Sequence, residues 1–209
     1  MGSHTDKLLT LLVLGAPGSG KGTQGMALGT IPRFFHFSCG DAFRSLDTRT
    51  RIGQEFLKYS SRGELVPDEV TVEFWKAQID NSRDSHLFKP DIDFLVLDGI
   101  PRNVRQAELM ENYMDVQQVF HLSCPDRSEL ARRLRKRALK DNRLDDANSE
   151  VIERRIRTYE DETKPILEFY SPAKVTNIDA TRPPAQVMHD ILSRVLELPK
   201  WQEVAKIVV

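Results

Sequence analysis

The chain of 209 residues is 40% hydrophobic and 29% charged, with a formal net charge of −1 at pH 7, which is ordinary for one globular domain. Near-zero charge gives no general attraction to nucleic acid or to an acidic membrane, and no apolar run reaches the roughly 20 residues of a membrane span. Two cysteines far apart, Cys39 and Cys124, do not form the ligand pattern of a zinc site. We therefore expect a cytoplasmic protein with one domain over residues 5–209 and no nucleic-acid, membrane or zinc partner.

Short apolar runs alternate with helix-like segments along the chain. Strands are expected at residues 8–15, 34–38, 94–99, 119–124 and 174–180. Helices are expected at residues 21–28, 68–82, 102–115, 126–140, 149–170 and 184–197. This alternation predicts an α/β fold of three layers, in which helices cover both faces of a five-stranded parallel sheet. The apolar tail at 201–209 is expected to pack back on the body.

The first expected strand runs directly into a glycine-rich turn, VLGAPGSGKGTQG at residues 13–25. The residues that fit the phosphate-loop pattern G-x-x-x-x-G-K-[ST] are Gly15, Gly20 and Lys21. In such a loop, backbone N–H groups, a helix N-terminus and the lysine bind phosphate oxygens. Gly22 stands where the pattern has a magnesium-binding hydroxyl, and the hydroxyl of Thr23 comes one residue later. The loop predicts nucleotide binding but does not identify the reaction.

Two segments interrupt the alternation of strands and helices. Residues 39–67 contain two short helical stretches, and residues 138–148 are polar and too weakly periodic for a core helix. We expect both segments to project from the carboxyl edge of the sheet, where open α/β sheets bind ligands.

Five stretches, taken together and in this order, resemble the adenylate kinase family of the nucleoside monophosphate kinases. They are GAPGSGKGTQ (15–24), FSCGDAFR (37–44), GELVPDE (63–69), LDGIPRNVRQAE (97–108) and RALKDNRLDD (137–146). The resemblance implies reversible, Mg²⁺-dependent phosphoryl transfer from ATP to AMP, giving two ADP, by positioning and charge stabilisation. It also implies that 39–67 is the monophosphate-binding insert and 138–148 a short lid. Within this family Gly22 is the usual residue.

The resemblance implies roles for individual residues. It places ATP on Gly15, Pro17, Gly18, Ser19, Gly20, Lys21, Gly22, Thr23, Arg133 and Arg137, with Arg133 stacked on the adenine. It places AMP on Cys39, Gly40, Arg44, Val66, Gly99, Arg102, Gln106, Arg143 and Arg155. The implied catalytic residues are Lys21, Asp98, Arg102, Arg137, Arg143 and Arg155. Asp98 would orient water around the magnesium of MgATP.

The lid is expected to be short and free of zinc, because only residues 138–142 separate Arg137 from Arg143. Asp145 and Asp146 match the acidic pair that follows the lid arginine in the family and are expected to steady the lid. The spacing to Tyr159 favours Arg155 over its neighbour Arg154 as the third closing arginine.

The sequence departs from the family pattern around the monophosphate site. Cys39 replaces the usual Thr, Ile100 replaces Phe or Tyr, and NVR follows Arg102. Gln106 fits adenine, because a carboxamide pairs with a donor–acceptor edge. UMP/CMP kinases typically have Ala and Asn at the positions of Cys39 and Gln106 and stay the nearest alternative. A non-catalytic nucleotide-binding or assembly factor on the same fold is a more distant one. A monomer is expected.

Overall fold

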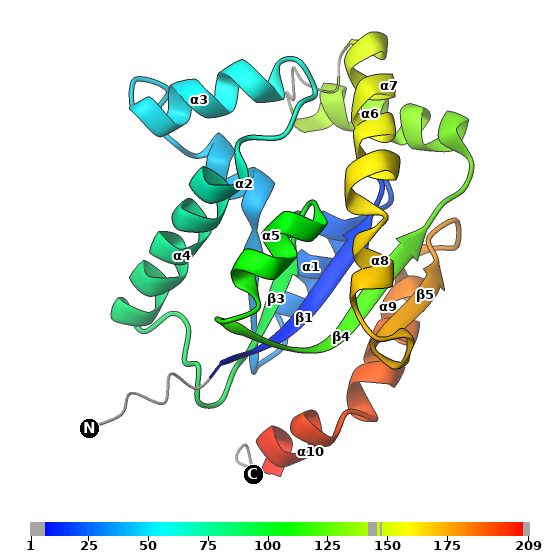
Figure 1. Ribbon diagram of the computed structural model, residues 1–209. Coiled ribbons are helices and arrows are strands. Elements are labelled where there is room, and N and C mark those ends of the chain that lie inside the picture. The colour runs from blue at the N-terminus through cyan, green and yellow to red at the C-terminus, as the bar shows by residue number, and fades with distance from the viewer. Residues whose placement is uncertain (1–6, 142–145, 147, 207–209) are drawn as a thin grey trace.

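The computed structural model describes residues 7–141, 146 and 148–206 and is shown in Figure 1. Within these residues five parallel strands form one sheet in the order β2-β3-β1-β4-β5. The strands are β1 (Leu8–Gly15), β2 (Phe34–Ser38), β3 (Phe94–Asp98), β4 (Met114–Ser123) and β5 (Val175–Asp179). The predicted α/β fold with a five-stranded parallel sheet is therefore confirmed.

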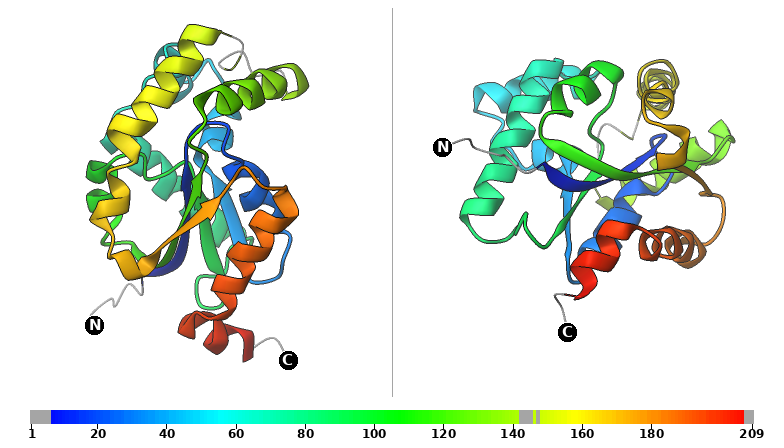
Figure 2. Two further views of the ribbon diagram at one scale, coloured as in Figure 1. Left: turned by 90° about the vertical axis from the view of Figure 1, so that its right-hand side faces the viewer. Right: turned by 60° about the horizontal axis from the view of Figure 1, so that its bottom comes forward.

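Helices cover both faces of the sheet (Figures 1 and 2). On β1, Leu11 and Val13 join a core with Leu28 of α1, whereas Leu12 and Leu14 join the core on the opposite face. The first face is covered by α1 (Lys21–Gly29), α6 (Arg127–Asp141), α7 (Ser149–Thr158), α9 (Pro184–Leu196) and α10 (Pro199–Ala205). The second is covered by α2 (Cys39–Arg44), α4 (Asp68–Asp84), α5 (Val104–Met110) and α8 (Ile166–Phe169). Burial on both faces explains why β1 is almost continuously apolar.

Two boundaries near the middle of the chain differ from the prediction. The helix predicted over 102–115 spans only Val104–Met110, and β4 begins at Met114 rather than at residue 119. The early part of β4 carries polar residues that obscure its strand pattern. Gln118 is nevertheless 1% exposed, because its Nε2 donates to the carbonyl of Lys174 (2.6 Å) and to Thr176 Oγ1 (2.9 Å). Hydrogen bonds to β5 and the segment before it thus allow a buried glutamine where the sequence indicates surface.

The helix predicted over 149–170 is interrupted. After α7 the chain forms one π-helical segment, Tyr159–Thr163, in which the N–H of Lys164 donates to the carbonyl of Tyr159 at 2.9 Å. Pro165 follows and has no N–H to continue the ladder, so α8 is a separate short helix. Such π-helical turns occur frequently at functional sites.

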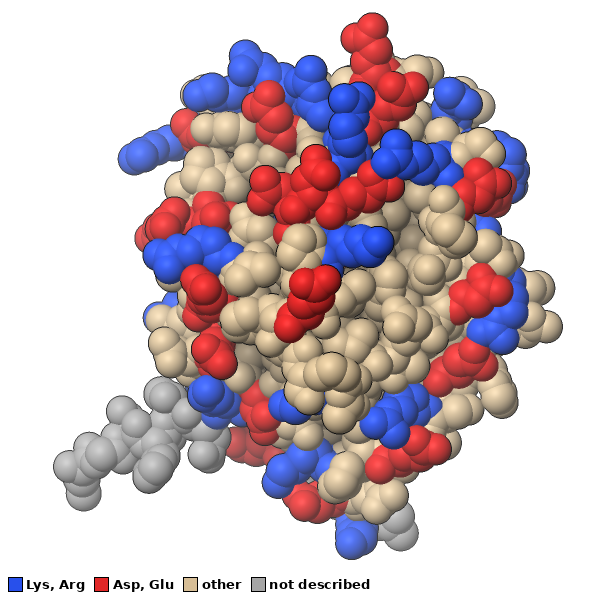
Figure 3. All heavy atoms as spheres, turned by 45° about the vertical axis from the view of Figure 1, so that its right-hand side comes forward, with Lys and Arg blue, Asp and Glu red and all other residues tan. Residues whose placement is uncertain are grey.

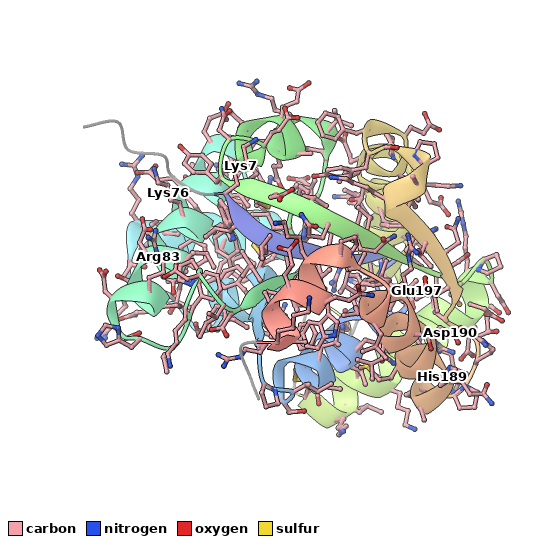
Figure 4. All side chains as sticks on the ribbon, turned by 90° about the horizontal axis from the view of Figure 1, so that it is seen from below. Lys7, Lys76, Arg83, His189, Asp190 and Glu197 are labelled. Carbon is pink, nitrogen blue, oxygen red and sulfur yellow. The ribbon has the colours of Figure 1, made fainter. Side chains whose placement is uncertain are left out.

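Residues 201–206 of the tail pack back on the body as predicted, and residues 207–209 lie outside the described residues. Trp201 of α10 stacks on Phe34 of β2 with ring centroids 4.7 Å apart. In the view from below, Lys76 and Arg83 of α4 lie on one side of the sheet, and Asp190 of α9 and Glu197, which follows α9, lie on the other (Figure 4). No helix among the described residues is long and apolar enough to cross a membrane.

Candidate active site

The phosphate loop connects β1 to α1 at the carboxyl edge of the sheet. Gly15, Gly18 and Gly20 have φ values of +151°, +86° and +98°. A Cβ on Gly18 would also lie 2.9 Å from the carbonyl oxygen of Leu130, so this position needs glycine. Gly20 precedes α1, and no side chain of the described residues caps the helix there. The first N–H groups of α1 are therefore available to an anion.

Lys21 is the first residue of α1, and its Nζ donates to the carbonyl of Ala16 at 3.1 Å. Burial lowers the pKa of this lysine to about 8, an effect that Arg102, Arg137 and Arg155 increase and Asp98 opposes. Several cations thus converge here around one acidic side chain. Such a shifted lysine in a cleft indicates a site built for a strong anion.

Asp98 ends β3 and is 7% exposed. A Cβ on Gly22 would lie 3.4 Å from Asp98 Oδ2, so the carboxylate of β3 lies beside the position where the general loop pattern has a hydroxyl. Among the described residues no group of three or more His, Cys, Asp or Glu side chains is arranged to hold a metal. Any divalent ion at Asp98 would consequently need water or a ligand to complete its shell.

A large cleft of about 980 Å³ opens along this edge. Its walls include the loop, Asp98, and Gly40, Arg44, Gly99, Arg102, Arg133, Arg137 and Arg155. A second pocket is lined by Cys39, Gly40, Arg44, Val66, Arg102, Gln106 and Arg155, together with Phe43 and Phe56. The structure thus brings the described members of the sequence-predicted set to two adjoining pockets. Arg143 and Asp145 lie outside the described residues.

A buried carboxylate joins two of the predicted arginines. Asp146 is fully buried; it accepts from Arg137 Nε at 2.7 Å and from Arg155 Nη1. Arg155 is 16% exposed and lies in the cleft wall, whereas Arg154 is 57% exposed and lies 3.6 Å from Glu64. Asp146 therefore holds two guanidinium groups together at the cleft wall.

Cys39 is the first residue of α2 and is 2% exposed. Burial raises the pKa of its thiol to about 12, so the side chain stays a neutral, weak donor and not a reactive thiolate. Arg44, the last residue of α2, forms an ion pair with Asp41 at 2.7 Å. The second pocket thus has a neutral wall at Cys39 and a cationic one at Arg44 and Arg102.

Arg133 is fixed in the cleft wall by two contacts. Its Nε donates to Glu129 at 2.7 Å and its Nη1 donates to the carbonyl of Ala180 at 2.9 Å. The hydrogen bonds from Arg132 and Arg133 lower the pKa of Glu129 to about 2, so this carboxylate stays ionised. On the face shown in Figure 3, Lys and Arg side chains are interspersed with Asp and Glu side chains.

The sequence did not predict four cations of the large cleft: Arg132, Lys136, Lys140 and Arg182. Arg182 follows β5 at the carboxyl edge, and that position at a strand end was an available signal. Arg132, Lys136 and Lys140 belong to the basic run of α6, in which a cleft-facing side cannot be distinguished from a solvated one by composition.

Comparison with known proteins was consistent with this geometry. The family model described as adenylate kinase matches residues 13–175. The chain is 35% identical over 189 residues to the adenylate kinase of Cyanothece sp. (strain PCC 7425), covering 87% of this chain and 92% of that one. It is 34% identical over 173 residues to the adenylate kinase of Bacteroides thetaiotaomicron, with coverages of 80% and 87%. It is 36% identical over 166 residues to that of Leptospira biflexa, with coverages of 77% and 84%.

Proposed function

The chain belongs to the adenylate kinase family, and on that premise we propose that it transfers a phosphoryl group reversibly from ATP to AMP, giving two ADP. The observation that carries this proposal is the shared wall of the two pockets. Both are lined by Gly40, Arg44, Gly63, Leu65, Arg102 and Arg155. A donor phosphate chain in the large cleft and an acceptor phosphate from the smaller pocket would therefore meet at the same arginines.

The proposed chemistry needs positioning and charge, and no protein nucleophile. Lys21 and the loop N–H groups hold the phosphates of ATP, and Arg44 and Arg102 hold the phosphate of AMP. Arg137, Arg143 and Arg155 surround the transferring group, and their planar guanidinium groups suit bidentate phosphate binding. Asp146 supports this arrangement, since it already holds Arg137 and Arg155 side by side.

The residues around Asp98 fit a magnesium ion that is held mainly by phosphates and water. Mg²⁺ in phosphoryl-transfer sites typically takes one or two carboxylates and keeps several waters. The single carboxylate beside Gly22 matches that requirement. When bound, the ion would offset phosphate charge, and Asp98 would orient its water shell.

We further propose that residues 39–67 close over AMP and residues 138–148 over ATP, in a monomeric, cytoplasmic enzyme. Closure would exclude water, which otherwise competes with AMP for the phosphoryl group. The arginines of α6 and α7 support this proposal, because they stand on the wall that the lid segment joins.

Initial rates with AMP, CMP, UMP and GMP as acceptors, at fixed MgATP, test the function. We expect AMP to be the best acceptor and chelation of the metal to abolish turnover. The matched control is Lys21→Met, purified identically, which separates this activity from a contaminating host kinase. A preference for CMP or UMP would favour the UMP/CMP kinase alternative. MgATP-dependent ADP formation no greater than in Lys21→Met would favour a non-catalytic factor.

A further inference from the structure

The carboxamide of Gln106 is held at both ends by protein groups. Gln106 is 1% exposed; its Oε1 accepts from the backbone N–H of Arg102 at 2.8 Å. Its Nε2 donates to Asp68 Oδ1 at 2.9 Å, and Asn103 Nδ2 donates to the same oxygen at 2.9 Å. Asn103 also caps α5 by accepting from the N–H of Gln106 at 2.8 Å. The unusual residue after Arg102 thus belongs to a network around Gln106.

This network allows only one orientation of the carboxamide. A backbone N–H can only donate, and an ionised carboxylate can only accept. A reversed carboxamide would place its NH₂ against the N–H of Arg102 and its oxygen against Asp68. Both contacts would be lost in a buried place, where unmatched polar groups are costly. The donor of Gln106 therefore stays on the side of Asp68 and its acceptor on the side of Arg102.

After these contacts Gln106 retains one N–H and one lone pair for a ligand. Gln106 lines the smaller pocket, together with Cys39, Val66 and Thr71. Asp68 lines a neighbouring depression with Pro67 and Asn103. Asp68 can therefore influence a ligand bound in the smaller pocket through its hydrogen bond to Gln106.

We propose that Asp68 is a positioning residue that makes the acceptor pocket select a 6-aminopurine over a 6-oxopurine. This inference rests on the proposed function, in which the acceptor base lies against Gln106. Adenine presents an N6–H donor and an N1 acceptor on one edge, whereas hypoxanthine presents an O6 acceptor and an N1–H donor there. The two bases therefore need opposite orientations of the carboxamide. By fixing one orientation, Asp68 makes the pocket discriminate between them.

The test measures kcat and KM for AMP and for inosine monophosphate, with MgATP saturating, in the full-length protein. Asp68→Leu removes the acceptor at Nε2, so that only the N–H of Arg102 still favours the original orientation of the Gln106 carboxamide. We expect it to lower the ratio of kcat/KM for AMP to that for inosine monophosphate by roughly tenfold to a hundredfold. The change should lie mainly in KM, because the base is remote from the transferring group.

Two further variants separate orientation from charge and folding. Asp68→Asn keeps an oxygen that can accept from both amides, so its ratio should stay within about threefold of the wild type. Glu69→Leu removes the neighbouring acidic side chain of the same helical turn, which is 72% exposed and lies 3.7 Å from Arg105. It should leave the ratio unchanged.

Three outcomes contradict the inference. Equal losses for both nucleotides in Asp68→Leu would mean that Asp68 only stabilises the fold. If Asp68→Asn lowered the ratio of the two kcat/KM values as much as Asp68→Leu does, the charge of Asp68, and not its accepting oxygen, would determine the discrimination. A wild type that phosphorylates inosine monophosphate as well as AMP would show that the pocket does not discriminate. A wild type that fails to phosphorylate AMP at all overturns the proposed function itself.

Discussion

Lys21 provides a prediction about pH. Its pKa is lowered from 10.5 to about 8, so in the free protein the side chain is largely neutral at pH 9. Bound phosphates favour the charged form and raise this pKa, so ATP binding at pH 9 should take up close to one proton. Below about pH 7 the lysine is already charged and contributes no uptake. Calorimetric titration of ATP in buffers of different ionisation enthalpy measures the number of protons.

Lys21→Arg is the matched control for this measurement, because a guanidinium stays charged throughout this pH range. The variant should bind ATP at pH 9 without the uptake seen in the wild type. Equal proton uptake by the two proteins would assign it to another group.

Arg155 and Arg154 form a natural pair for mutagenesis, since they are adjacent but face different surroundings. Arg155→Ala removes a cation from the shared wall of both pockets and should lower kcat by about 100-fold. Arg154→Ala removes an exposed side chain beside Glu64 and should change kcat by less than about twofold. Steady-state rates and melting curves of both variants provide the comparison. Similar kcat values for the two variants would reject the assignment of Arg155.

At the residue scale, the sequence best predicts functional residues that lie close to one another in the chain. The phosphate loop lies within one strand, one turn and one helix, so Gly15, Gly20 and Lys21 are recognisable from their spacing. Asp68 has no such signal, because its partners Asn103 and Gln106 are far away in the sequence and only folding brings them together.

At the element scale, hydrophobic pattern predicts every strand, and the errors occur where pattern and local bonding disagree. The start of β4 is missed because buried Gln118 reads as a surface residue. The break after α7 is missed because Tyr159–Thr163 are suited to a helix, and only the i−5 hydrogen bond and Pro165 set the interruption. Neither the start of β4 nor the break after α7 changes the hydrophobic periodicity of the sequence.

The helix α10 is an element whose role is predicted to be structural. Trp201 packs on Phe34, and Phe94 lies at a centroid distance of 6.0 Å from it. Trp201→Ala should lower the free energy of unfolding by about 2–3 kcal/mol, because a large apolar contact is lost. Urea denaturation measures this change. The kcat should stay within about twofold of the wild type, since Trp201 does not line the cleft.

Leu196→Ala is the control for the Trp201→Ala variant. This side chain belongs to α9 and is 59% exposed, so its removal should change the free energy of unfolding by less than about 0.5 kcal/mol. If Trp201→Ala were equally mild, the stacking on Phe34 would not stabilise the fold.

At the scale of the whole molecule, segments far apart in sequence meet at the mouth of the cleft. The turn after α3 (Arg51–Ser60) lies against α7: Arg154 Nη1 donates to the carbonyl of Arg62 at 3.2 Å, and Thr158 Oγ1 donates to that of Gly63 at 3.4 Å. The proposed monophosphate insert thus touches the helix that carries Arg155. A displacement of the turn after α3 should therefore also displace α7, and the reverse.

Gly63 is the point where this contact is tightest. Its φ is +71°, and a Cβ there would lie 3.1 Å from Arg155 Cγ and 3.2 Å from the carbonyl oxygen of Val151. Gly63→Ala should strain the turn and push it away from α7, at a cost of about 1 kcal/mol in stability. Because Gly63 lines the smaller pocket and belongs to the segment 39–67 proposed to close over AMP, we expect the KM for AMP to rise about tenfold while the KM for ATP changes much less.

Ser61→Ala, in the same turn, provides the control for this prediction. Ser61 is exposed, and its hydroxyl donates to the carbonyl of Lys58 in the last turn of α3 at 3.3 Å, so both KM values should stay at the wild-type level. Steady-state kinetics with each nucleotide varied in turn gives the two constants separately. A Gly63→Ala protein with equal rises in both constants would indicate general loosening of the fold. A selective rise for AMP would instead show that the packing of the turn against α7 shapes the acceptor side of the cleft.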